Sequence, residues 1–230
     1  MSPAADFSLE KAVTALSAAA VQAGAKPFKG ATGVWAGAVE IAVLDTVLSI
    51  GEFQPSSAAA VLPRLRAFKA FRGPSNMMRV LAMLGPAGLA DFVQDQKQID
   101  LVLKASGALL DAGINGAEDV ATDGEAAKTQ REALLSVVGV PECAWEYFLL
   151  ALGLRTPETD RLQKRWISRF ISNTTGATGL EGPIRDSLLQ AVTERIDTDY
   201  QQRYFGRMPT FTLPQLRQAI LRVEYFNTTG

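Results

Sequence analysis

Apolar residues recur along the chain at the three- and four-residue spacing of amphipathic helices, and no segment shows the alternation of a surface strand. Val61, Leu65 and Phe68 share one helical face, and Leu216 and Ile220 share another. This pattern continues from the first tens of residues to the last. The sequence therefore predicts an all-α fold of roughly ten helices with short connections.

Capping residues and helix breakers divide this pattern into separate helices. Gly113 and Gly139 stop two of them, and Pro183 suits the first turn of a third. Residues 212–215, Thr-Leu-Pro-Gln, form a capping box that opens the last helix. The predicted helices cover residues 8–24, 34–51, a segment starting at Ser56 or Ser57, 75–85, 95–113, 124–139, two segments within 137–170, 183–196, and a segment from 212 onward.

Organisation and location follow from features that the chain lacks. We find no internal repeat and no flexible linker, so we expect residues 1–230 to form a single all-helical domain. Apolar runs are broken by charge or glycine well before the about 18 residues of a membrane span. The first residues show no basic start and no apolar core of a signal peptide. We therefore expect a cytoplasmic protein with no membrane partner.

The residue types restrict the chemistry further. The chain has no histidine, which excludes histidine bases and histidine-ligated metal sites. Its one cysteine, Cys143, excludes an internal disulfide and a four-cysteine iron–sulfur cluster, and we expect no cofactor. The net charge of −1 gives no general attraction to nucleic acid. Charge is nevertheless segregated, because residues 64–79 hold five basic residues and no acid while residues 116–125 hold four acids and no base.

Residues 137–170 are the most informative stretch. A helix ends at Val137 or Val138, the chain turns through Gly139–Pro141, and a second helix starts near Glu142. The first N–H groups of a helix have no partner inside it, so such a turn can hold a phosphate through its main chain. An ordinary pair of antiparallel helices gives the same pattern, and both interpretations remain open here.

The residues that follow this turn extend the pattern into a longer motif. Residues 137–143 read Val-Val-Gly-Val-Pro-Glu-Cys, an apolar segment ends at Gly153, and Asp160 is followed five residues later by Arg165. This resembles the helix-hairpin-helix DNA glycosylase superfamily, to which endonuclease III belongs, whose signature is Leu-Pro-Gly-Val-Gly-x-Lys, an apolar helix, a catalytic Asp and an Arg at +5. The specific match covers residues 134–170, and the helical layout fits over roughly 35–226.

The resemblance implies a compact multi-helix domain with two lobes around a cleft. Its helix-hairpin-helix region would cover residues 124–153, and the helix that carries the catalytic acid would cover 156–172. Asp160 would be the catalytic carboxylate, and DNA would be the partner. The residues implied to contact DNA are Gly139, Val140, Glu142, Cys143, Arg165 and Arg169.

Several positions depart from the family pattern. Pro141 replaces the second glycine of the hairpin, so one phosphate-facing N–H is lost. Cys143 stands where bifunctional members carry the lysine that forms a Schiff base, so the implied enzyme is monofunctional and leaves an abasic strand uncut. Leu162 replaces a common histidine, and Gly51 replaces the glutamine that wedges between bases.

A second correspondence lies upstream, at Asp45. The adenine-removing branch of the family carries at this position a glutamate that protonates the departing base. Hydrolysis of an N-glycosidic bond passes through a positively charged sugar, so one carboxylate would stabilise it while a protonated acid assists the leaving base. Asp160 near a helix start favours the anion, and Asp45 in an apolar helix favours the proton. Trp35, Phe71 and Trp145 are candidates for a pocket that holds the extruded base.

Each of these residues also has a purely structural interpretation. Asp45 can be a buried acid bonded to a neighbouring helix end, and Asp160 can be a simple first-turn acid. The aromatic residues can belong to the core, Arg165 and Arg169 can lie on a solvated face, and Cys143 can be a small buried residue.

Three hypotheses follow. The first is a base-excision enzyme of DNA repair, a monofunctional DNA glycosylase that hydrolyses an N-glycosidic bond. The second is a non-catalytic descendant of that fold that binds DNA or a protein partner. The third is an unrelated all-α interaction domain.

Overall fold

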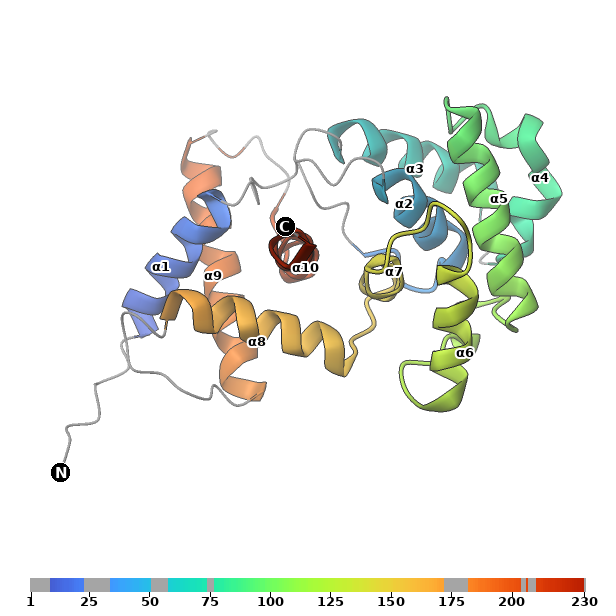
Figure 1. The fold of residues 1–230 in the computed structure, drawn as a ribbon. Helices are drawn as coiled ribbons and strands as arrows, with labels where there is room; N and C mark the ends of the chain where they lie inside the picture. The colour runs from blue at the N-terminus through green and yellow to red at the C-terminus, as the bar shows by residue number, and fades with distance from the viewer. Residues whose placement is uncertain are drawn as a thin grey trace. The chain divides into compact units, whose positions relative to one another are not determined.

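The computed structural model describes residues 9–22, 34–50, 58–73, 77–171, 182–203, 206 and 210–229. All regular secondary structure in these residues is helical, with ten α-helices and one short 3-10 helix (Figure 1). The all-α prediction is therefore confirmed. Contacts between Cα atoms divide the chain into two compact units, which we name the central unit (Val34–Thr156) and the terminal unit (Met1–Gly33 with Pro157–Gly230).

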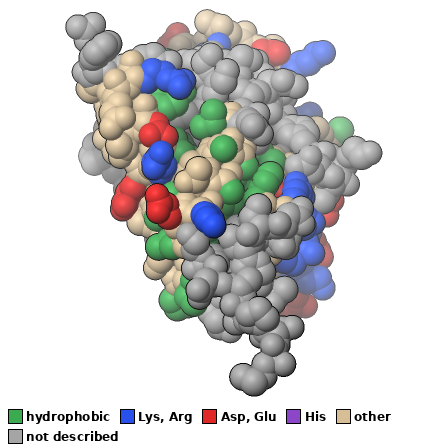
Figure 2. All heavy atoms as spheres, turned by 90° about the vertical axis from the view of Figure 1, so that its left-hand side faces the viewer, with side chains coloured by type: hydrophobic (Ala, Val, Ile, Leu, Met, Phe, Trp, Pro, Cys, Tyr) green, Lys and Arg blue, Asp and Glu red, His purple; other side chains and the backbone are tan. Residues whose placement is uncertain are grey.

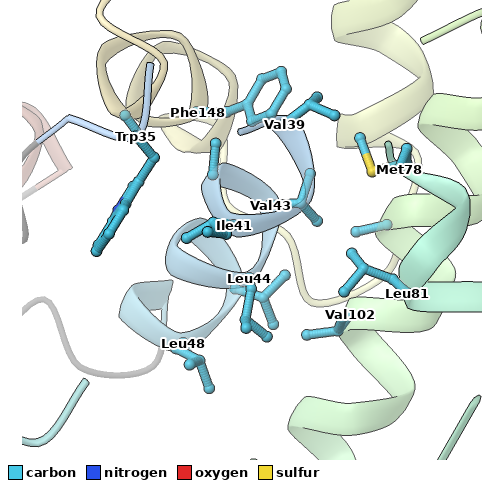
Figure 3. Packing of buried hydrophobic residues seen from close by; sticks show 14 of the residues in the cluster. Trp35, Val39, Ile41, Val43, Leu44, Leu48, Met78, Leu81, Val102 and Phe148 are labelled. Carbon is cyan, nitrogen blue, oxygen red and sulfur yellow. The ribbon is translucent and has the colours of Figure 1, made fainter. Parts of the chain in front are cut away.

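The central unit is built around α2, which contacts α3, α4, α5 and α7. This helix is apolar almost all round, so every face of it gains from burial. Figure 3 shows Trp35 on one side of α2 and Met78, Leu81 and Val102 on the opposite side. The helices of this unit are α2 (Val39–Ile50), α3 (Ala58–Arg72), α4 (Arg79–Leu89), α5 (Gln96–Asp111), the 3-10 helix η1 (Ala117–Asp119), α6 (Gly124–Leu135) and α7 (Ala144–Ala151).

The terminal unit joins the first helix of the chain to the last three. Apolar side chains from all four helices form one core, in which Leu16, Trp166, Leu188 and Ile220 are buried. α1 packs on α8 and α9, and α10 packs on the same two helices. The helices of this unit are α1 (Leu9–Gln22), α8 (Pro157–Ile171), α9 (Gly182–Arg203) and α10 (Leu213–Thr229).

Most predicted helices appear near their predicted bounds, and the differences have local causes. The helix predicted over 34–51 begins at Val39, because Gly37 takes a left-handed φ of 73° in the turn before it. The helix predicted to stop at Gly85 does leave helical geometry there (φ 59°, ψ −169°). Pro86 then starts a further helical turn that runs to Leu89.

The capping box of the last helix is present in part. The side-chain oxygen of Gln215 accepts hydrogen bonds from the Thr212 backbone N–H and from its hydroxyl, both at 2.9 Å. The helix that begins with Gly182 and Pro183 runs to Arg203, beyond the predicted end at residue 196.

Of the helices in the described residues, none is long and apolar enough to cross a membrane. The single domain over residues 1–230, the helix-hairpin-helix motif and the two lobes around a cleft all stay predictions.

Candidate functional site

The turn between α6 and α7 is closed by its own backbone. The N–H of Val140 donates to the carbonyl of Val137 at 3.0 Å, and Gly139 takes a φ of 98° that favours glycine. α7 begins at Ala144, whose N–H donates to the carbonyl of Pro141 at 2.9 Å. The predicted turn therefore lies between two helices, but the connection is longer than predicted: α6 ends at Leu135 rather than at Val137 or Val138, and α7 starts at Ala144 rather than near Glu142.

Two backbone donors of this turn are available to a ligand. Gly139 and Glu142 are exposed, and within the described part of the chain the backbone N–H of neither residue donates a hydrogen bond. Val138, at the tip, has 94% of its surface exposed. The start of α7 adds the partial positive charge of a helix N-terminus to the same place.

An open groove of about 270 Å³ lies between this turn and α5. The turn contributes Val138 and Gly139, and α5 contributes Leu101 and two exposed lysines, Lys97 and Lys104. The lysines are seven residues apart, which is nearly two helical turns, so they lie on the same face of α5. The groove therefore places Gly139, one of the two residues with an unused backbone N–H, beside two cations.

Acidic side chains lie on both sides of the groove and limit its positive charge. Asp100 lines it and accepts a hydrogen bond from the side-chain amide of Gln96 at 2.8 Å. Beyond the turn, Arg131 lies 3.6 Å from the carboxylates of both Glu142 and Glu146.

Cys143 precedes α7 as a small buried residue with 5% of its surface exposed. This burial fits the structural interpretation of the cysteine.

Asp45 is fully buried in the central unit and is surrounded by hydrogen-bond donors. The indole Nε1 of Trp35 donates to Oδ2 at 3.0 Å, while the hydroxyls of Ser49 and Tyr147 donate to Oδ1 at 3.2 and 3.4 Å. The two hydroxyls also lie 3.3 Å from each other. This arrangement stabilises a carboxylate and joins α2 to α7 and to the segment before α2.

A second buried acid lies one turn earlier on α2. Glu40 is fully buried, and its Oε1 lies 2.6 Å from Nε of Arg72, which ends α3. Burial raises the pKa of Glu40 above its usual range, and the nearby Arg72 guanidinium lowers it to a smaller extent. This pair fixes the end of α3 against α2.

Asp160 lies in the first turn of α8, as predicted, and about a third of its side chain is exposed. Its Oδ2 accepts a hydrogen bond of 2.8 Å from Nη2 of Arg185, a mostly buried residue of α9. The carboxyl group is thus paired with an arginine beside a helix start.

Arg165 and Arg169 both bind one carboxylate within the terminal unit. Nε of Arg165 and Nη2 of Arg169 donate to the same oxygen of Glu224, at 2.7 and 3.0 Å. Glu224 is fully buried, while the side chains of Arg165 and Arg169 are 36% and 40% exposed. Their charge is therefore partly neutralised inside the protein. On the face drawn in Figure 2, the described acidic and basic side chains lie beside one another and form no continuous basic patch.

The three candidate pocket aromatics have different environments. Trp35 and Trp145 are buried in the core of the central unit, which agrees with their structural interpretation. Phe71 is instead 60% exposed on α3. The structure therefore does not bring the three rings together in one buried cluster.

Sequence reasoning missed four residues that define these sites. Lys97 and Lys104 were detectable, because a spacing of seven places them on one helical face. Arg185 and Glu224 gave no such signal, because each pairs with a residue far away in the sequence, at separations of 25 and 59 residues from Asp160 and Arg165.

The two predicted catalytic carboxylates belong to different units. Asp45 lies in the central unit and Asp160 in the terminal unit, so a site shared by both stays a prediction. Among the described residues, no group of acidic and cysteine side chains is arranged to hold a metal ion.

Comparisons of the chain with protein families, with curated proteins and with solved structures find no match. The resemblance to DNA glycosylases therefore depends on the sequence motif alone.

Proposed function

We propose that this chain binds duplex DNA, contacting the sugar–phosphate backbone with the α6–α7 turn, and that it does so without excising a base. The observation that supports this proposal is the groove in which Gly139 of the turn lies beside Lys97 and Lys104 of α5. Backbone N–H groups and lysines are among the groups with which proteins position a phosphate.

The groove carries little net positive charge. Its lining contains two lysines and one aspartate, Asp100, so one of the two positive charges is offset. The Asp100 carboxylate also accepts a hydrogen bond from Gln96. The remaining positive charge is small, so we expect weak to moderate binding that depends strongly on salt. Pro141 contributes no N–H, which lowers the expected affinity further.

The environment of Asp45 supports binding without catalysis. A general acid must present its proton to the leaving base, yet Asp45 is fully buried and accepts hydrogen bonds from Trp35, Ser49 and Tyr147. These contacts suit a structural carboxylate.

A monofunctional DNA glycosylase is the second candidate, and one observation favours it. Asp160 is oriented by Arg185, stays partly exposed and lies at a helix start, as a carboxylate that stabilises a positively charged sugar would. The two candidates share the DNA-binding turn and differ only in the chemistry.

The binding proposal is tested by fluorescence anisotropy with labelled duplex DNA at several salt concentrations. Replacing Lys97 and Lys104 together by Ala should reduce the salt slope of log K by about 1.8, at about 0.9 for each phosphate contact. A matched variant, Arg195→Ala with Arg203→Ala, removes two exposed charges from α9 and should leave the slope unchanged.

A second pair of variants tests the turn itself. Val138 is almost fully exposed, so Val138→Asp adds a negative charge at the tip without removing packing, and Val138→Ser is its neutral control. We expect only the aspartate variant to weaken duplex binding several-fold. Equal affinity of the wild type, the lysine double variant and Val138→Asp would exclude the turn as the contact.

Base release from a panel of damaged and mispaired duplexes separates the two candidates. We expect no free base from the wild type. Release that is abolished in Asp160→Asn, with DNA binding retained, would instead establish the glycosylase. Borohydride trapping of a covalent adduct would contradict both candidates, because Cys143 cannot form an imine.

A further inference from the structure

α3, labelled in Figure 1, belongs to the central unit, and its exposed residues include the basic side chains of Arg66 and Lys69. The helix contains four basic residues and no acid. Arg72 turns inward to Glu40, and Arg64 donates to the side chain of Gln94 at 3.1 Å. Arg66 and Lys69 remain exposed, so the charged side chains on the outward surface of α3 are all cations.

The geometry of α3 separates this surface from the core. At 100° per residue, Arg66 points away from the buried stripe formed by Val61, Leu65 and Phe68. Lys69 lies at the edge of the stripe, where its Nζ is 5.8 Å from the centroid of the Trp35 ring. This contact orients the lysine without neutralising its charge.

An exposed aromatic ring lies at the end of the same helix. Phe71 is 60% exposed, although a phenylalanine gains from burial. Its ring is supported by Phe92, with the centroids 5.2 Å apart and the planes inclined at 48°. Phe92 is itself packed on Phe68 in an edge-to-face contact at 5.2 Å. The exposed ring is therefore fixed in place by a stack that reaches into the core.

Small side chains occupy the surface between the cations and the ring. Ala67 and Ala70 are both exposed and project little from the helix. A ligand can therefore approach the helix closely between Arg66 and Phe71.

We propose that α3 binds an unpaired strand of nucleic acid, with a base stacked on Phe71 and phosphates at Arg66 and Lys69. A fixed exposed ring on one flank of the helix and cations on the other, with small side chains between them, match the two contacts that single strands use, stacking and backbone neutralisation. Duplex DNA keeps its bases stacked on each other and offers no free base to the ring. An acidic peptide would use the cations but gains nothing from Phe71, and a membrane surface requires a broader apolar face than one ring.

This surface is built from other residues than the α6–α7 turn, so the inference does not depend on the proposed function. Variants of α3 should change binding to single strands, while Lys97→Ala with Lys104→Ala should change binding to duplexes. The two proposals can therefore fail separately.

The experiment measures anisotropy of labelled oligothymidylate and of a labelled duplex with the full chain. Phe71→Ala should weaken binding to the single strand about five-fold or more, because stacking on one aromatic ring contributes at least about that factor. Phe71→Tyr should retain the affinity. Met83→Ala is the control for loss of an exposed apolar side chain, since Met83 is 80% exposed on α4, and it should have no effect.

The charge contact is measured with Arg66→Ala combined with Lys69→Ala. The salt slope for the single strand should fall by about 1.4, at about 0.7 for each phosphate. The double variant Arg195→Ala with Arg203→Ala should leave this slope unchanged. Circular dichroism and thermal unfolding of every variant verify that the fold is retained, and the double charge variant still tests the proposal if Phe71→Ala unfolds.

Two results would overturn the inference. The first is a single-strand affinity that is the same in the wild type, in Phe71→Ala and in the double charge variant. The second is competition by polyglutamate or by anionic vesicles as effective as unlabelled oligothymidylate, because binding would then depend on charge alone.

Discussion

The indole of Trp35 donates a 3.0 Å hydrogen bond to the carboxylate of Asp45, ten residues along the chain and fully buried. The backbone N–H of Trp35 also donates to the carbonyl of Ala151, at 2.6 Å. Trp35 thus ties the segment before α2 to α2 and to the end of α7. A buried carboxylate with several donors is stable only while they stay in place, so this relationship predicts how the central unit responds to substitution.

Asp45→Asn should destabilise the protein, because the carboxamide NH₂ would face groups that themselves donate. We expect a loss of about 1–3 kcal/mol in the free energy of unfolding, measured by urea denaturation. Ser49→Ala removes one donor to the carboxylate and should cost less. A variant Asp45→Asn as stable as the wild type would contradict the structural role and would favour the acid role predicted from the sequence.

The buried pair of Glu40 and Arg72 predicts a pH dependence. Because burial raises the pKa of Glu40 above 4.5, the folded chain holds this proton to a higher pH than the unfolded chain does. The resulting stabilisation is fully present below pH 4.5 and is lost as the pH rises through the raised pKa of the folded state.

Glu40→Gln removes this titration. The stability of the wild type minus that of the variant, from denaturation at a series of pH values, should therefore fall as the pH rises from 4.5. Glu132→Gln, which removes an exposed acid of the same unit, serves as the control and should give an almost constant difference. A difference for Glu40→Gln that grows with pH would show that the sign is wrong.

The shared contact of Arg165 and Arg169 with Glu224 gives a third prediction. Replacing both arginines by Ala leaves a buried carboxylate without these two cations, which should cost about 3 kcal/mol of stability. Adding Glu224→Gln to the double variant should restore part of this loss. The sequence instead predicted phosphate contacts, and in that case the double variant would flatten the salt slope of DNA binding. A flattened slope with unchanged stability would favour the sequence prediction.

The sequence by itself determined where the helices lie. Periodic apolar residues, Gly139 and Pro183 act on their immediate neighbours, so the α6–α7 turn and the starts of α8 and α9 could be located without coordinates. The sequence also excluded histidine bases and histidine-ligated metal sites, because the chain contains no histidine.

The partners of the charged residues were decided only by the tertiary structure. Arg165 and Glu224 are 59 residues apart, and Tyr147 and Asp45 are 102 residues apart, so each contact depends on how distant helices pack. No local pattern encodes that packing. The exposure of Phe71 was also decided by the tertiary structure. A phenylalanine on a helix is predicted to be buried, and only the packing of the neighbouring helices leaves this ring exposed.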